Sequence, residues 1–205
     1  YKNHSTQEID KICKAIKKLF PKSLNKDTSN ELWSEKDCFL ITYADSVTKK
    51  SQNNLVTLKV FLEKYCKEFS HLHILPFYPY SSDDGFAVID YKKIEEKHGE
   101  WKDFSKLSSK FKIMCDLVIN HCSSKNYLFK NFLEQLDPGS DFFISSEKKF
   151  TNFTKVVRPR SSELSKKIKI KDKTRYVWCT FSHDQIDFNF KSPNVLLFFL
   201  EIIKF

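Results

Sequence analysis

The chain has 205 residues, of which 40% are hydrophobic and 15% aromatic, so it can bury the core of about one domain and differs from a disordered segment. Its longest apolar run, residues 195–200, is far shorter than the roughly 20 residues that a membrane-spanning helix needs, which excludes a transmembrane segment. The net charge is +9, and residues 148–175 account for all of it with eleven basic and two acidic side chains.

The two chain ends and the cysteines predict the extent of the protein and its cellular location. It begins at Tyr1 without an apolar leader and stops at Phe205 inside an apolar segment, so we expect both ends to be cuts in a longer protein. The six cysteines form no CxxC pair and no spacing typical of a zinc site. This pattern predicts reduced thiols, a cytoplasmic location and no metal site.

The first predicted element is a helix over residues 5–20. Apolar side chains recur there at helical spacing, Ser5 is a candidate N-cap, and Pro21 marks the end. Residues 22–37 are polar and are expected to form a loop. The chain therefore opens with a helical extension before the main apolar pattern begins.

Short apolar runs then alternate with segments of helical spacing. The expected strands lie within 38–43, 71–76 and 113–119, and the expected helices within 55–65 and 101–111. Strands that alternate with helices are typical of βα units and a parallel sheet, so we predict an α/β fold whose sheet is buried on both faces.

The pattern changes after the third strand. A short helix is expected near 124–136, and the turn at Asp137–Gly139 opens a basic and aromatic stretch. We predict that residues 140–184 form an irregular insertion, and that Pro193 begins a helix that runs to the end of the chain. The three glycines allow neither GxGxxG nor a P-loop, which excludes the familiar nucleotide-binding folds.

Polar and aromatic side chains follow the ends of the three predicted strands. They lie at Tyr43–Asp45, at Pro76–Phe86 and at Asn120–His121. Function in βα folds is located at the carboxyl ends of the strands. Carboxylates and imidazoles bind hydroxyl groups, and aromatic faces pack on sugar rings, so this mixture indicates a carbohydrate site.

Several motifs carry a family resemblance. Residues 116–121, with the sequence DLVINH, match the DxxxNH signature of the α-amylase family, glycoside hydrolase family 13. The other matching segments are ITYAD (41–45), HILPF (73–77), DDGF (83–86), RPR (158–160), VW (177–178) and DQID (184–187). Their order and spacing over about residues 37–205 resemble the sucrose phosphorylase and glucosylglycerate phosphorylase subfamily.

The resemblance implies a fold and a domain order. We expect an incomplete (β/α)8 TIM barrel, comprising about the first three βα units, with an irregular insertion domain after the third strand. The implied boundaries are a helical extension at 1–36, the first barrel units at 37–136, the insertion at 137–184 and a return to the barrel at 185–205.

The resemblance also implies roles for single residues. Asp83 resembles the carboxylate that binds distal hydroxyls of the donor glucose, and Phe86 resembles the aromatic platform under that ring. His121 resembles the histidine that contacts the outer hydroxyls, and Gln185 resembles a residue of the insertion near the sugar. The remaining expectations are that Asp116 and Asn120 brace the active-site floor, and that Arg158 or Arg160 meets phosphate on the acceptor side.

The implied activity is α-glucosyl transfer with retention, through a covalent glucosyl-enzyme, with inorganic phosphate as co-substrate and no cofactor. Retaining enzymes need a nucleophile and an acid about 5 Å apart. In this family both follow later strands than those present here, so we predict no catalytic residue in the chain and no activity of the chain alone. An α-glucoside hydrolase of the same family and a non-catalytic carbohydrate-binding remnant are the alternatives.

Plainer interpretations of these residues remain open. Asp116 can form a structural ion pair, and His71 and His73 alternate on a strand and are expected to be packing or surface residues. The basic run from Lys166 to Arg175 fits a solvated loop better than a nucleic-acid site, so a sugar and phosphate are the expected partners, without nucleic acid or a membrane. Unpaired edges of an open barrel lead us to expect self-association of the chain.

Overall fold

The structure is a computed structural model that describes residues 4–21, 33–151, 153, 156–158, 160–171 and 173–205. The predicted loop at 22–37 lies partly outside these residues. The chain divides into two compact units. We call Asp27–Val118 the strand–helix unit, and Tyr1–Lys26 together with Ile119–Phe205 the antiparallel unit.

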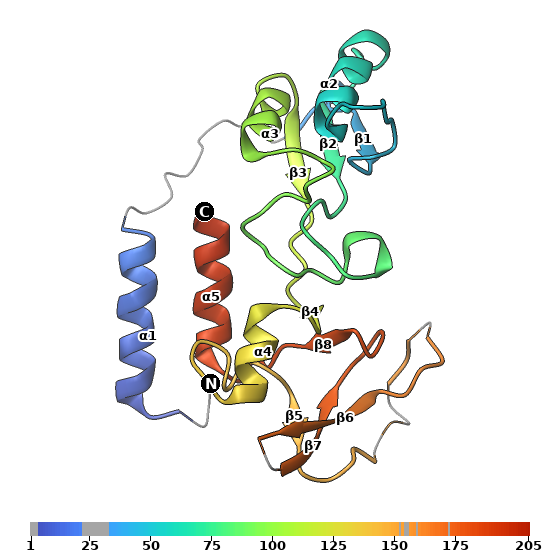
Figure 1. The fold of residues 1–205 in the computed structure, drawn as a ribbon. Helices are drawn as coiled ribbons and strands as arrows, with labels where there is room; N and C mark the ends of the chain where they lie inside the picture. The colour runs from blue at the N-terminus through green and yellow to red at the C-terminus, as the bar shows by residue number, and fades with distance from the viewer. Residues whose placement is uncertain (1–3, 22–32, 152, 154–155, 159, 172) are drawn as a thin grey trace. The chain divides into compact units, whose positions relative to one another are not determined.

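The strand–helix unit is built on a three-stranded parallel sheet with the order β1-β2-β3 (Figure 1). Its elements are β1 (Phe39–Thr42), α2 (Asn54–Tyr65), β2 (His71–Ile74), α3 (Trp101–Ser108) and β3 (Lys112–Cys115). The three strands pair in register, with Leu40 beside Leu72 and Leu72 beside Ile113. The predicted alternation of strands and helices is confirmed, although the third strand ends at Cys115 rather than at residue 119.

One face of this sheet carries the core of the unit. Leu72 and Ile74 of β2 are buried, and so are Leu55 and Leu58 of α2 and Leu107 of α3. Successive side chains of a strand point to opposite faces, so residues 72 and 74 define the face that the two helices cover. The helical spacing of the sequence therefore predicts these core positions, although Phe61 and Tyr65 of the same predicted helix are exposed.

The opposite face of the sheet is open. Phe39 and Ile41 of β1 are 51% and 63% exposed, and Met114 of β3 is 47% exposed. The register places Ile41 beside His73 and His73 beside Met114, so these side chains form one row across the sheet. The prediction of a sheet buried on both faces is wrong for the described residues, because continuous apolar runs fit a covered and an uncovered face equally well.

The antiparallel unit contains two long helices that pack against each other. In α1 (Thr6–Leu19), the Ser5 side chain accepts a hydrogen bond from the Glu8 amide, and Glu8 accepts one from the Ser5 amide, which confirms Ser5 as the N-cap. α5 (Pro193–Lys204) has Ser192 as N-cap and Pro193 in its first turn. The two helices contact each other and run side by side in Figure 1.

The rest of this unit consists of a short helix and two antiparallel sheets. The elements are β4 (His121–Ser123), α4 (Tyr127–Glu134), β5 (Ser145–Ser146), β6 (Ser165–Ile170), β7 (Lys173–Trp178) and β8 (Gln185–Asp187). β4 pairs with β8, and the other three strands form a sheet with the order β5-β7-β6. The pairing of β4 with β8 brings residues more than sixty positions apart to neighbouring strands.

The prediction that residues 140–184 are irregular is wrong, because β5, β6 and β7 lie inside this range, whereas its assignment as an insertion stays a prediction. The strand β6 has the sequence SKKIKI, in which exposed Lys167 and Lys169 alternate with Ile168 and buried Ile170. Such an alternation is the pattern of a half-buried strand, but the short lysine-rich segment carries too little apolar signal to identify it. Its pairing with β7 stabilises it in the structure.

Candidate functional site

The loop that follows β2 carries the residues predicted to hold the donor sugar. It folds back on itself, with the Ser81 amide bonded to the Ala87 carbonyl at 3.1 Å, and contains the short 3-10 turn η1 (Asp83–Gly85). Asp83 is exposed and Phe86 is half-buried, and the Phe86 amide donates to the Asp83 carbonyl at 3.0 Å. The loop therefore holds Asp83 and Phe86 at fixed positions relative to each other.

Gly85 lets this loop approach the end of β2 closely. Its φ is +105°, a backbone conformation that residues with a Cβ rarely adopt. An added Cβ would lie 2.5 Å from the Pro76 carbonyl oxygen. Asp83 and Asp84 also have positive φ, at 58° and 49°. The turn that carries the predicted donor residues therefore has positive φ at three successive residues. It depends on glycine at position 85, where the backbone lies against Pro76.

Asp116 follows β3 and faces the neighbouring strand. Its Oδ2 lies 3.0 Å from His73 Nε2, and both side chains are partly shielded from solvent. The pair joins the uncovered face of β2 to the start of the DxxxNH motif. The interpretation of His73 as a packing or surface residue misses this hydrogen bond, because residues 73 and 116 are brought together only by the β2–β3 register.

His121, Asn120 and Gln185 form one cluster in the antiparallel unit. His121 and Gln185 are 3% and 1% exposed. The imidazole Nδ1 lies 2.7 Å from Asn120 Nδ2, Nε2 lies 3.1 Å from Gln185 Nε2, and the ring packs against Phe181. A neutral imidazole donates at one nitrogen and accepts at the other, so one of the two amides turns its oxygen to the ring.

Asp187 adds a carboxylate beside this cluster. It stands opposite His121 in the β4–β8 register, and its Oδ1 accepts a hydrogen bond from the Thr180 amide at 3.0 Å. Burial raises the pKa of Asp187, and the hydrogen bonds from Thr180 oppose that shift. The sequence motif 184–187 includes Asp187 but carries no signal that separates it from Gln185 as a functional residue.

The two arginines predicted to meet phosphate lie in the insertion. Arg158 Nη1 donates to the Thr180 carbonyl at 2.7 Å and to Ser162 Oγ at 3.2 Å, and Arg160 is exposed. Pro159, which separates them, lies outside the described residues. A guanidinium has five N–H groups, so these two bonds fix Arg158 in place and leave further donors for an anion.

The strand ends of the strand–helix unit also form a pocket that the sequence does not predict as a unit. It has a volume of about 260 Å³. The six residues that line it are Tyr43, Asp45, Pro76, Tyr80, Asp84 and His98. The motif residues Tyr43 and Asp45 are thus placed at a cavity, whereas Tyr80 and His98 carry no motif that singles them out.

The predicted site residues are divided between the two units. Asp83, Phe86 and Asp116 belong to the strand–helix unit, whereas Asn120, His121 and Gln185 belong to the antiparallel unit. The expectation that Asp83, Phe86 and His121 line one hollow stays a prediction. Over the residues that the structure describes, no cluster of three metal-ligating side chains is present, and no helix is long and apolar enough to cross a membrane.

Comparison with known proteins gives consistent results. The model of the alpha amylase catalytic domain matches residues 43–205. The chain is 43% identical over 173 residues to the glucosylglycerate phosphorylase of Escherichia coli K12, covering 83% of this chain and 31% of that protein. It is 36% identical over 184 residues to the sucrose 6(F)-phosphate phosphorylase of Thermoanaerobacterium thermosaccharolyticum, covering 80% of this chain and 36% of that protein.

Solved structures match as well. The crystal structure of sucrose 6F-phosphate phosphorylase from Thermoanaerobacter thermosaccharolyticum superposes with a TM-score of 0.71 at 35% identity, over 84% of this chain and 37% of that chain. A trehalulose synthase has the same fold, with a TM-score of 0.68 at 19% identity over 82% of this chain and 33% of that chain. The chain spans about a third of the length of the curated relatives named above.

Proposed function

Because the chain belongs to the α-amylase family, we propose that it is the N-terminal part of a retaining glycoside phosphorylase that transfers an α-glucosyl group to inorganic phosphate. The family is the one that the DxxxNH motif at 116–121 indicates. The observation that carries the finer proposal is the 43% identity over 173 residues to a glucosylglycerate phosphorylase, supported by 36% identity to a sucrose 6(F)-phosphate phosphorylase.

The donor glucose is proposed to meet three groups of this chain. Asp83 accepts hydrogen bonds from distal hydroxyls, Phe86 packs under the ring, and His121 contacts the outer hydroxyls. Gln185 positions His121, since its amide lies 3.1 Å from the imidazole Nε2. Asp116 and Asn120 are positioning residues, Asp116 through its hydrogen bond to His73 and Asn120 through its contact with His121.

The acceptor is proposed to meet the insertion. Arg158 is anchored on the Thr180 carbonyl, and Arg160 is exposed two residues further on. A guanidinium binds phosphate through paired N–H groups, which suits a co-substrate that must replace water in the second displacement. Phosphate rather than water would then take the glucosyl group, and the product would be an α-glucose phosphate.

We assign no catalytic carboxylate to this chain. Asp83 sits in an exposed turn, and Asp116 is bonded to His73, so each has a binding or positioning role. Retention needs a nucleophile and an acid about 5 Å apart, and we propose that the remainder of a longer protein supplies both. The 205-residue chain alone is therefore expected to bind sugar without cleaving it.

The test compares donors in the longest protein that the gene encodes around this chain. Purified protein is incubated with glucosylglycerate, sucrose or sucrose 6(F)-phosphate, with and without inorganic phosphate, and glucose 1-phosphate and free glucose are measured. Phosphate-dependent glucose 1-phosphate is expected. Free glucose formed without phosphate would make the protein a hydrolase of the same family, and turnover of none of the donors would reject the proposal.

Variants link the activity to this chain. Removal of a hydrogen bond to a charged or buried polar group, in Asp83→Asn or His121→Gln, should lower kcat/KM by about 10- to 100-fold. The matched control is Glu134→Gln, an exposed position at the end of α4, which should leave kcat/KM unchanged. Glucose 1-phosphate made by the 205-residue chain alone would contradict the absence of catalytic carboxylates.

A further inference from the structure

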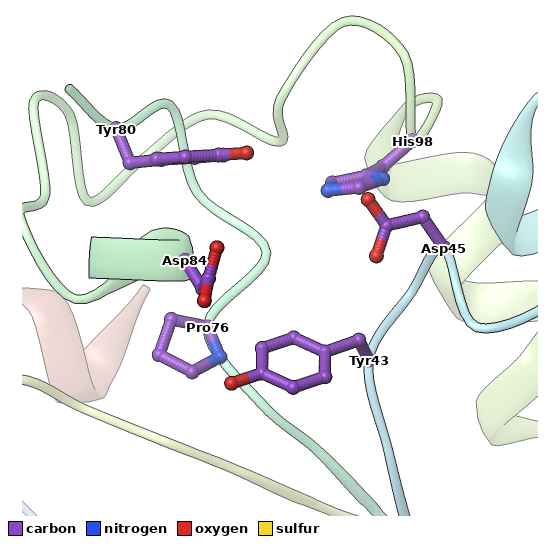
Figure 2. Close-up of a pocket in the computed structure, with 6 residues that line it drawn as sticks. All are labelled: Tyr43, Asp45, Pro76, Tyr80, Asp84 and His98. Atoms are coloured by element: carbon purple, nitrogen blue, oxygen red, sulfur yellow. The ribbon is translucent and has the colours of Figure 1, made fainter. Parts of the chain in front are cut away.

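The pocket of the strand–helix unit has walls drawn from four segments. Tyr43 and Asp45 follow β1, Pro76 and Tyr80 follow β2, Asp84 lies in η1, and His98 precedes α3. The six side chains surround an open space in Figure 2, with Tyr80 and Tyr43 on opposite sides and the ring of His98 turned inward. Neither Asp83 nor Phe86 lines this pocket, so it is distinct from the residues proposed to hold the donor glucose.

The walls are fixed by contacts within the unit. Lys97 Nζ lies 3.0 Å from Asp45 Oδ2 and 3.2 Å from the Tyr80 hydroxyl, so one ammonium group ties the β1 and β2 segments together. The Leu55 amide donates to the His98 carbonyl at 3.1 Å, and Gly85 allows η1 to lie against Pro76. The pocket is thus formed before any ligand arrives, which lowers the entropic cost of binding.

His98 directs an unused polar group into the pocket. His98 is 3% exposed, and its Nδ1 lies 3.0 Å from Asn54 Nδ2. In the tautomer whose Nδ1 accepts a hydrogen bond from the Asn54 amide, the ring proton lies on Nε2. Nε2 has no hydrogen-bond partner among the residues that the structure describes, and the ring lines the pocket. A hydrogen-bond acceptor in the pocket would satisfy it.

Asp84 supplies the complementary group. Its carboxylate has neither a hydrogen-bond nor an ion-pair partner in the described part of the chain, and it points into the open space in Figure 2. The charge of Asp45, in contrast, is already offset by Lys97, whose ammonium group also lies 5.4 Å from the centre of the Tyr80 ring. The pocket therefore combines one N–H donor, one free carboxylate acceptor and two tyrosines.

These groups restrict the chemistry of the occupant. A hydroxyl group both accepts from an imidazole N–H and donates to a carboxylate, whereas an ammonium group cannot accept and an anion is repelled by Asp84. Burial lowers the pKa of His98, so the ring stays neutral near pH 7 and does not favour an anion. The volume of about 260 Å³ lies below the roughly 300–1,000 Å³ of pockets for drug-sized ligands, which suits a molecule no larger than a monosaccharide.

We propose that this pocket is a second carbohydrate site, which binds a small neutral polyhydroxylated molecule between His98 Nε2 and the Asp84 carboxylate. Tyr43 and Tyr80 pack on the C–H faces of the ligand from opposite sides. The site lies beside the proposed donor residues in the chain but uses different side chains. Its occupancy does not depend on phosphorolysis.

The test uses three probes that share one ring and differ in charge, namely glucose, glucosamine and glucuronate. Binding to the 205-residue chain is measured by saturation-transfer NMR, and the His98 ring resonances are followed by 15N-edited spectra. Glucose is expected to bind and to shift the His98 Nε2 signal, while glucuronate should not bind. Binding of glucosamine in preference to glucose, or no binding of glucose, would overturn the proposal.

Variants separate this site from the donor residues. Asp84→Asn keeps a residue type that tolerates positive φ and should weaken glucose binding about tenfold by removing a charge-assisted hydrogen bond. Tyr43→Ala is a second variant, because the glucose signal should also weaken when one aromatic wall is lost. The matched control is Glu96→Gln, an exposed position of the same unit, which should bind glucose as the parent does.

Asp83→Asn distinguishes failure of this proposal from failure of the proposed function. Glucose binding and the His98 shift should survive that change if the second site is real. Loss of both in Asp83→Asn, with retention of both in Asp84→Asn, would assign the sugar to the donor residues. That result would overturn the second site and leave the phosphorylase proposal standing.

Discussion

The two units each contain a buried histidine, and the two rings are used differently. In the antiparallel unit both ring nitrogens of His121 face side-chain amides, from Asn120 and Gln185. In the strand–helix unit Asn54 meets one nitrogen of His98, and the other opens on a pocket. Both residues are 3% exposed, so burial alone does not distinguish them.

The two histidines represent two kinds of buried polar group, one bonded within the protein and one with a nitrogen open to a ligand. A buried histidine whose two nitrogens are both met by protein rigidifies its surroundings, and a ligand that uses it must compete with an existing contact. A buried histidine with one nitrogen open to a cavity has a hydrogen bond still to make. His98 has this arrangement, whereas the sequence motif directs attention to His121.

Gly85→Ala should destabilise the protein more than any other substitution considered, and it removes the pocket on which His98 opens. The added Cβ would lie 2.5 Å from the Pro76 carbonyl oxygen at a φ of +105°. We expect a loss of about 3 kcal/mol in the free energy of unfolding, from the strained backbone and the clash together. Urea unfolding followed by tryptophan fluorescence measures it, and glucose binding should disappear with the pocket.

Two further substitutions serve as controls for this change. Gly139→Ala is strained in the same way in the antiparallel unit, where its Cβ would lie 2.6 Å from the Leu128 carbonyl oxygen, and it should leave the His98 signals in place. Ser108→Ala lies on the exposed end of α3 and should change stability little. A Gly85→Ala protein as stable as Ser108→Ala would contradict the account of this turn.

Loss of an amide partner should cost more stability at His121 than at His98. Gln185→Leu removes the partner of His121 in a closed site. It should lower the free energy of unfolding by about 2 kcal/mol, because the buried ring nitrogen loses its hydrogen bond and water cannot replace the lost partner. Asn54→Leu removes the partner of His98 beside an open pocket and should cost about 1 kcal/mol. Urea midpoints of the two variants measure the difference.

A reversed order of these two costs would show that the contacts of His121 are dispensable. The isosteric changes Gln185→Glu and Asn54→Asp serve as a second pair, because they keep the shape of the side chain and alter only the group that faces the ring. They should separate lost packing from lost hydrogen bonding at each histidine.

The smallest effect is a pH dependence of opposite sign in the two units. Burial lowers the pKa of His98, so the unfolded state binds more protons below its ordinary value of 6.5, and stability falls as pH falls through that value. Burial raises the pKa of Asp187, so the folded state holds its proton more tightly, and stability falls as pH rises from 3.8 through the raised value.

Difference curves isolate the two groups. Stability is measured from pH 4 to pH 8 for the parent, His98→Gln and Asp187→Asn, and each variant is subtracted from the parent. The contribution of His98 should rise with pH and that of Asp187 should fall with pH. Slopes of the same sign in both subtractions would contradict the assignment.

Local signals in the sequence located most elements. The serine at position 5 and the glutamate three residues later form the capping box that begins α1, and Pro193 lies in the first turn of α5, as expected. The strands β1 and β2 lie inside the apolar runs that predicted them. In contrast, β6 was not predicted, because its alternating lysines carry little apolar signal and its pairing with β7 provides the stability.

The candidate site was predictable where a motif marks it and not elsewhere. Residues 116–121 identified the family, and Asn120, His121 and Gln185 do lie together in the structure. His98 has no motif, because its role depends on the hydrogen bond to Asn54 and on a cavity formed by loops more than fifty residues apart. The assignments of Asp83, Phe86 and the arginines as ligand contacts stay predictions.

Membership in the α-amylase family and the order of strands and helices in the first half of the chain follow from local patterns in the sequence. Those properties depend on short-range periodicity and on motifs within a few residues. Three contacts appear only once the chain has folded: His73 bonds to Asp116, both ring nitrogens of His121 face amides, and His98 opens on a pocket. Each of these contacts joins distant segments through strand register and loop packing, which a local pattern does not encode.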